Sequence, residues 1–291
     1  MHGYNTARFA RGSFAVASLG LALNAASPAL AGAQADPKKD PRDTTHAQTQ
    51  APFFTLKDGL LAAGFVGATL AMFPLDKRTA HALLDSSTQA NRFFKHAATD
   101  VEIITSPGAY IIGASLYTVG KLRGYGRVAD LGWHGTEAVL FAQGVTTVLK
   151  GVVGRGRPFL SNGKDPSDYH LGKGFSSGDW SSFPSGHTST AFAAAAAVTN
   201  ETTRWWPRST WVVGPLMYGG ATMVGLSRMY HYRHWGSDVA LGAAIGTFSG
   251  RKVVQYMHGH PGNRLDHFML STQIVPDGRG GARISTTIPL P

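Results

Sequence analysis

Apolar stretches of helical length recur along the chain from about residue 59 onward. They are rich in Ala, Gly and Leu, have few alternating polar positions, and are too long for typical strands. This pattern predicts an all-α fold, a six-helix bundle. The predicted helices cover Gly59–Leu75, Ile103–Gly120, Ala138–Leu149, Thr188–Asn200, Trp211–Leu226 and Val239–Ser249.

The N-terminus has the pattern of a secretory signal. Arg8 and Arg11 precede an apolar run, Phe14–Ala26, and the small residues Ala29–Ala31 offer a cleavage site. We therefore expect a signal peptide over residues 1–31 and an exported protein. An uncleaved membrane anchor is the alternative.

We expect the helical domain over residues 57–258, because the segments on either side of it have different sequence patterns. Residues 32–56 are rich in Asp, Lys, Pro, Thr and Gln, which predicts a flexible leader. In the tail, residues 259–291, two apolar runs flank Pro276–Gly281 and suggest a small β-hairpin, with a disordered tail as the alternative.

Composition narrows the possible chemistry. The chain contains no cysteine, which excludes disulfides, thiolate metal sites and a cysteine nucleophile. Its net charge is +10, but the basic residues are scattered and accompany no nucleic-acid-binding motif, so we expect no nucleic-acid partner. Anionic substrates or an anionic membrane surface explain the charge with fewer assumptions.

Three polar motifs stand at the ends of apolar stretches. In the first, Lys150 and Arg157 are separated by six residues, where a helix ends in a Gly-rich turn, so the two cations can converge. Basic residues that complement the helix dipole explain this pair equally well.

The second motif, Phe183–His187, precedes an alanine-rich run and therefore occupies a helix N-terminus, where free N–H groups attract anions. Ser185 can donate its hydroxyl, Gly186 permits close backbone approach, and His187 can protonate a leaving oxygen. Plain N-capping by Ser185 is the alternative.

The third motif, Ser227–Asp238, contains His234 and Asp238 four residues apart. On a helical turn this spacing brings the carboxylate against an imidazole nitrogen, which is the orienting pair that a histidine nucleophile requires. A surface His–Asp pair is the alternative.

Together, the motifs resemble the signature of the phosphatidic acid phosphatase type 2 and vanadium haloperoxidase superfamily. That signature reads Lys, six residues, Arg-Pro; then Pro-Ser-Gly-His; then Ser-Arg, five residues, His, three residues, Asp. Every position is matched without substitution, and the resemblance covers roughly residues 59–256.

The resemblance implies a metal-independent phosphomonoester hydrolase, an acid or lipid phosphatase, with its active site at one end of the bundle. It implies no cofactor and a phosphorylated small-molecule or lipid substrate. His234 would be the nucleophile, Asp238 its orienting carboxylate and His187 the proton donor. The implied phosphate-binding residues are Lys150, Arg157, Ser185, Gly186 and Arg228.

Other assignments stay open at this stage. A vanadate-dependent haloperoxidase, with vanadate as cofactor, uses the same cradle, although its known members are larger chains. A catalytically dead phosphate-binding module is a third possibility. The signature gives Arg155 and His231 no role, and a solvated surface position is at least as good an interpretation of Arg155.

Helix length bears on location, because many superfamily members are six-span membrane enzymes. The uncharged runs Ala138–Leu149, Thr188–Asn200 and Val239–Gly250 would reach only ~18–20 Å, against roughly 30 Å of hydrocarbon. We therefore expect a periplasmic globular or membrane-associated enzyme, with a multi-pass inner-membrane protein as the alternative. The sequence leaves the oligomeric state open.

Overall fold

The computed structural model describes residues 53–85, 88–89, 98, 105, 107–260, 263–271, 273–276 and 282–285. The predicted signal peptide and most of the predicted leader lie outside these residues.

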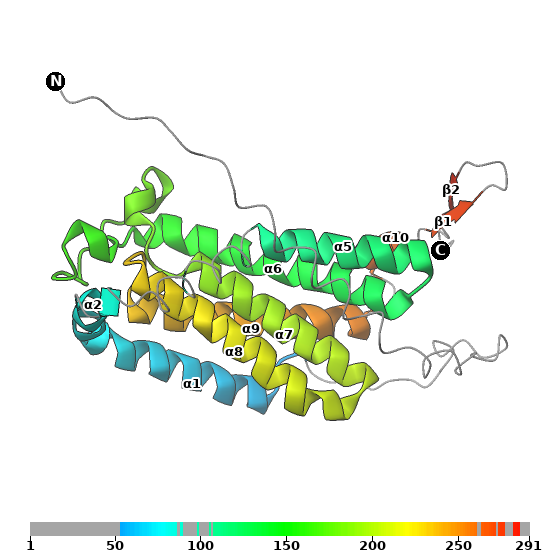
Figure 1. Ribbon diagram of the computed structural model, residues 1–291, viewed down its shortest axis with the longest axis horizontal. Coiled ribbons are helices and arrows are strands. Elements are labelled where there is room, and N and C mark those ends of the chain that lie inside the picture. Colours follow the sequence, from blue (N-terminus) through cyan, green and yellow to red (C-terminus); the bar gives the residue numbers. More distant parts are fainter. Residues whose placement is uncertain are drawn as a thin grey trace, which may run out of the picture. The chain divides into compact units, whose positions relative to one another are not determined.

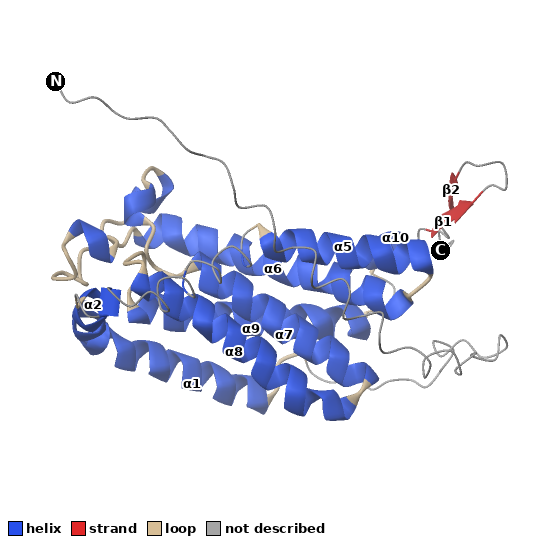
Figure 2. Cartoon of the chain, viewed as in Figure 1, coloured by secondary structure: helices blue, strands red, loops and turns tan. Residues whose placement is uncertain are grey.

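The helical class is confirmed (Figures 1 and 2). Long helices run side by side: α1 (Leu56–Met72), α5 (Gly108–Arg123), α6 (Gly126–Val153), α7 (Gly186–Trp205), α8 (Thr210–Tyr230) and α9 (Gly236–Gly259). Each overlaps one predicted stretch. The shorter elements are η1 (Phe73–Leu75), α2 (Asp76–Leu84), η2 (Pro158–Leu160), η3 (Lys173–Phe175), η4 (Gly178–Trp180), η5 (Pro207–Ser209) and α10 (Arg264–Ser271).

The helices that carry the motifs are longer than the apolar runs indicated. α6 has 28 residues, α7 has 20 and α9 has 24. At 1.5 Å per residue they span about 30–42 Å, so the prediction of short helices was wrong. The helices continue past the runs through polar residues that are buried inside the bundle: His134, before the first run, is 1% exposed, and Glu201, directly after the second, is 0% exposed.

A seam of glycines lets α9 pack closely against α7. Gly242, Gly246 and Gly250 recur every four residues on α9, and a Cβ added at any of them would lie 2.3–2.6 Å from a backbone carbonyl oxygen of α7 or of its N-cap residue, Ser185. Only glycine permits this approach, as in other helix pairs with small residues at this spacing. The seam fixes the start of α7, which carries the second motif, against the first turns of α9.

The tail contains a two-stranded pair. β1 (Gln273–Pro276) and β2 (Ala282–Ser285) run antiparallel, with Ile274 opposite Ile284. The first apolar run of the tail had been predicted as a strand of the hairpin, but it starts within helix α10 and only its end forms β1. Side chains of α5 stabilise this helix from outside: the hydroxyl of Tyr117 donates to the carbonyl of Met269 at 2.7 Å.

The chain turns at one end of the bundle bring the motifs together. α6 ends there at Gly154, whose φ of 58° is left-handed, and a Cβ at this position would lie 1.8 Å from the carbonyl oxygen of His170. Glycine is therefore required where the chain leaves α6. α7 and α9 begin at the same end, since the backbone N–H of Ser185 donates to the carbonyl of Asp238 at 2.9 Å.

Candidate active site

A cavity of about 460 Å³ opens at this end of the bundle. Six of the eight predicted site residues line it, whereas Ser185 and Asp238 are fully buried behind its wall. The lining residues are Tyr110, Gln143, Thr147, Lys150, Arg157, Ser181, Gly186, His187, Arg228 and His234.

His234 lies in the turn before α9 and is 4% exposed. Its Nδ1 atom is 2.7 Å from the carbonyl oxygen of Ser182. A carbonyl oxygen only accepts, so Nδ1 carries the proton and Nε2 keeps its lone pair. Burial, together with the nearby cations of Lys150 and Arg157, lowers the pKa of His234 well below its usual range. The imidazole is therefore neutral, with an unprotonated Nε2 atom.

Asp238 does not hydrogen-bond directly to His234, as the four-residue spacing had suggested. The distance from Nδ1 to its Oδ2 atom is 3.7 Å, which is too long for a hydrogen bond. His234 precedes the helix instead of lying on it, because α9 begins only at Gly236. Asp238 Oδ2 accepts from the Ser182 hydroxyl at 2.5 Å and from the Trp235 N–H at 2.8 Å. Asp238 is therefore connected to His234 through Ser182.

Arg155, for which a solvated position had been considered, is 0% exposed and lies directly behind Asp238. Its Nη1 atom donates to Asp238 Oδ1 at 2.6 Å and to the Ser237 hydroxyl at 2.7 Å. Nη2 donates to Asp76 Oδ2 at 2.8 Å, and Nε and Nη2 both donate to the carbonyl of Pro166. All five N–H groups are thus used, and Arg155, to which the signature gave no role, is bound to Asp238 and Asp76 behind the cavity.

Asp76, at the start of α2, completes this support. One of its carboxylate oxygens accepts from the backbone N–H of Ser237 at 2.8 Å, and the other accepts from the Ser237 hydroxyl at 2.6 Å. The carboxylate thus binds the N-terminus of α9, where free N–H groups favour negative charge. No local sequence pattern could have identified Asp76, because it lies 79 residues from Arg155.

Loop carbonyls hold two predicted phosphate ligands at the cavity. Lys150 Nζ donates to the carbonyl of Ser181 at 2.5 Å, and Arg157 Nε donates to the carbonyl of Gly178 at 2.9 Å. Burial and the neighbouring Arg228 lower the pKa of Arg157. The cavity therefore concentrates positive charge and is suited to an anion with several oxygens.

At the start of α7, Gly186 faces the cavity and Ser185 does not. The Ser185 side chain makes no capping hydrogen bond, and its hydroxyl accepts from Thr188 at 2.9 Å. Gln143 Nε2 donates to the carbonyl of Gly186 at 2.9 Å and positions this turn. Gln143 belongs to none of the three motifs, so no sequence signal marks it.

Residues 131–260 match the family model of the PAP2 superfamily, in agreement with the resemblance that the three motifs carry. The matched segment contains all eight predicted site residues. Arg155 and Ser182 lie within it, whereas Asp76 precedes it.

Two curated relatives and one solved structure resemble the chain. The lipid A 1-phosphatase of Porphyromonas gingivalis is 46% identical over 71 residues, which cover 24% of this chain and 15% of that protein. The probable diacylglycerol pyrophosphate phosphatase 1 of Schizosaccharomyces pombe is 29% identical over 198 residues, which cover 56% of this chain and 66% of that protein. The chain therefore spans less than two thirds of either relative.

The similar solved structure is that of a transmembrane PAP2 type phosphatidylglycerolphosphate phosphatase from Bacillus subtilis. It is 18% identical, with a TM-score of 0.31, and the match covers 66% of this chain and 96% of that one.

Proposed function

We propose that the protein is a phosphatase that hydrolyses phosphomonoesters through a phosphohistidine on His234. The observation that carries this proposal is a neutral imidazole whose unprotonated Nε2 belongs to a cavity lined by three cationic side chains. Those side chains are Lys150, Arg157 and Arg228. A nucleophile with a fixed tautomer beside preorganised cations is what phosphoryl transfer requires.

In the first step, Nε2 of His234 attacks phosphorus and the P–O bond to the alcohol breaks. His187, which lines the same cavity, gives its proton to the departing oxygen. The cationic side chains stabilise the charge on the equatorial oxygens of the transferred group.

In the second step, His187 takes a proton from water, and the resulting hydroxide attacks the phosphohistidine. The N–P bond breaks, inorganic phosphate leaves, and both histidines return to their starting states. Ser182, Asp238 and Arg155 hold the imidazole in place throughout, because Nδ1 keeps its proton and its carbonyl partner.

A phosphorylated lipid is the substrate class that we favour. The names of both curated relatives specify lipid phosphates or diphosphates. Those names do not support halide peroxidation by vanadate, which becomes the alternative outcome of the assay.

Phosphate release from a lipid phosphate in mixed micelles tests the function directly. We expect turnover of the lipid phosphate and no halide oxidation with vanadate and peroxide. Vanadate should inhibit the turnover competitively, because its adduct with His234 would mimic the transition state. The control is His234→Ala, prepared in the same detergent. Halide oxidation by the wild-type protein without any phosphate release would contradict the proposal.

We further propose that the helical region is embedded in a lipid bilayer. Large apolar side chains are exposed along the outer helices, whereas the buried residues are mostly small, polar or charged. Within the described residues, one helical stretch, Leu56–Leu84, is apolar and long enough to cross a membrane. The exposed side chains include Leu60, Val66, Leu70, Ile111, Ile112, Val119, Leu140, Phe141, Val148, Trp211, Val212, Leu216 and Met223.

An apolar exterior around a polar interior suits a hydrocarbon solvent better than water. The helix lengths agree, since about 30 Å is both the span of a 20-residue helix and the thickness of the hydrocarbon core. This proposal takes the multi-pass alternative in place of the periplasmic globular or membrane-associated enzyme, for which the short uncharged runs had been one argument.

Membrane fractionation distinguishes the two locations. We expect the protein in the membrane pellet after alkaline carbonate washing and in solution only with detergent. The reason is that the exposed apolar side chains of α1, α5 and α8 must be solvated by lipid or detergent. A peripheral membrane protein, which carbonate releases, is the control. Release of this protein by carbonate, followed by a monodisperse state without detergent, would support the globular alternative.

A further inference from the structure

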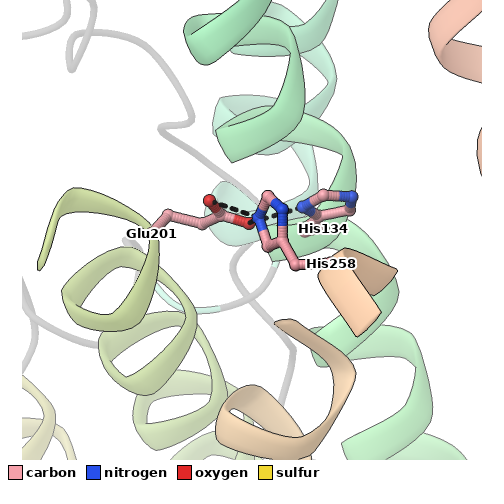
Figure 3. A group of neighbouring side chains, drawn as sticks. All are labelled: His134, Glu201 and His258. Atoms are coloured by element: carbon pink, nitrogen blue, oxygen red, sulfur yellow. Dashed lines mark hydrogen bonds and ion pairs between the residues drawn. The ribbon is translucent and has the colours of Figure 1, made fainter. Parts of the chain in front are cut away.

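A second cluster of ionisable side chains lies at the opposite end of the bundle from the cavity. His134 on α6, Glu201 on α7 and His258 on α9 point toward one another (Figure 3). His134 lies about 24 Å along α6 from Lys150 at 1.5 Å per residue. The cluster is therefore separate from the phosphate site.

The side chains of this cluster are in close contact, and two of the three are buried. His134 Nδ1 is 2.5 Å from Glu201 Oε1, and His258 Nε2 is 2.9 Å and 3.0 Å from the two oxygens of Glu201. The side chains of His134 and Glu201 are 2% and 0% exposed, and that of His258 is 22% exposed. One donor atom from each residue can be chosen so that all lie within 4.8 Å of one another.

Asp266 on α10 fixes the orientation of His134. Its Oδ1 atom is 3.2 Å from Nε2, the ring nitrogen that faces away from Glu201. A neutral imidazole that donates from Nε2 presents a lone pair at Nδ1. That lone pair faces a carboxylate oxygen, so the contact is favourable only if a proton or a metal ion lies between the two atoms.

The surroundings are rich in carboxylates. Glu137, one helical turn after His134, has an Oε2 atom that is buried without a hydrogen-bond partner among the described residues. It forms a second candidate metal-binding group with His134 and Asp266. Three carboxyl groups, those of Glu137, Glu201 and Asp266, thus lie around His134 and favour a multiply charged cation.

We propose that His134 Nδ1, His258 Nε2 and Glu201 bind a divalent transition metal ion such as Zn²⁺, with Asp266 as the hydrogen-bond partner that orients His134. Two imidazoles and a carboxylate are a common set of ligands for Zn²⁺. The ring nitrogen of a ligand histidine that does not bind the metal usually donates to a carboxylate, as His134 does to Asp266. Zinc bonds of about 2.0–2.1 Å need only a small opening of the present contacts.

The role of this ion would be structural. It would join α6, α7 and α9 at the end of the bundle opposite the predicted phosphate-binding residues, and Asp266 would add α10 through its contact with His134. The inference does not depend on the proposed phosphatase activity, because metal content can be measured without an assay.

Metal analysis of the full-length protein, purified in detergent without a histidine tag, tests the site. We expect about one Zn²⁺ per chain, and visible ligand-field absorption after replacement by Co²⁺. His134→Gln and His258→Gln should lose the ion, and Asp266→Asn should bind it about 10–100-fold more weakly. The matched control is His81→Gln on α2, an exposed histidine outside the cluster, which should retain the ion.

Two results would overturn the proposal. One is wild-type protein that neither contains nor takes up Zn²⁺ or Co²⁺, which would leave a protonated imidazole between the carboxylates. The other is Co²⁺ absorption that survives both His134→Gln and His258→Gln. If these variants do not fold, the wild-type Co²⁺ spectrum decides, because imidazole ligation alters its position and intensity.

Discussion

His187→Ala should convert steady turnover of an aryl phosphate into a burst of about one phenol per active site, followed by turnover slowed about 10²–10⁴-fold. An aryl oxide leaves without much protonation, so His234 can still become phosphorylated. The second step then stalls because no base activates water. Rapid mixing with excess aryl phosphate measures both phases.

Two comparisons make this burst diagnostic. An alkyl phosphate needs protonation of its leaving oxygen, so the same variant should react poorly with it from the start. His234→Ala should show neither burst nor turnover with either substrate. Steady turnover by His234→Ala would mean that another residue is the nucleophile.

Arg155→Gln should lower kcat on the order of 10²-fold and leave KM nearly unchanged, because a small misplacement of a reacting group has effects of this size. Arg155 does not line the cavity, but it holds Asp238, which in turn holds Ser182 and His234. The variant should also lose about 3–5 kcal/mol of stability, since Asp76 and Asp238 would be buried without their cation.

Measuring kcat per titrated active site distinguishes a positioning role of Arg155 from an effect on stability alone. Arg155→Lys keeps the charge but not the five-donor fork, so its kcat should lie between those of the wild type and Arg155→Gln. The control Arg204→Gln changes an exposed residue of α7 and should alter stability by no more than about 0.5 kcal/mol. If kcat per titrated site is normal in Arg155→Gln, the residue contributes only to folding.

The sequence predicted the helical class and six residues of the cavity wall because these features are local. A continuous apolar run is enough to indicate a helix. The three motifs lie where α6 ends and where α7 and α9 begin, and these helix ends meet at one end of the bundle. The tautomer of His234 was less accessible. It depends on the carbonyl of Ser182, a backbone atom 52 residues away that no side-chain pattern encodes.

Buried polar residues explain the differences between the predicted and the observed structure. The apolar runs stopped short of His134 and Glu201, so the helices were predicted too short and the membrane alternative was disfavoured. A solvated position had been considered for Arg155 because its partners, Asp76 and Asp238, lie in distant segments. A charge that is paired only in the folded chain looks like a surface charge in the sequence.

The most direct test of the phosphohistidine mechanism is to trap the intermediate. His187→Ala is mixed with phosphorus-labelled aryl phosphate, quenched in alkali and digested, and the labelled peptide is mapped by mass spectrometry. We predict acid-labile, base-stable phosphate on His234. Acid-stable phosphate on a serine, or turnover with no covalent phosphate at any time point, would contradict the mechanism.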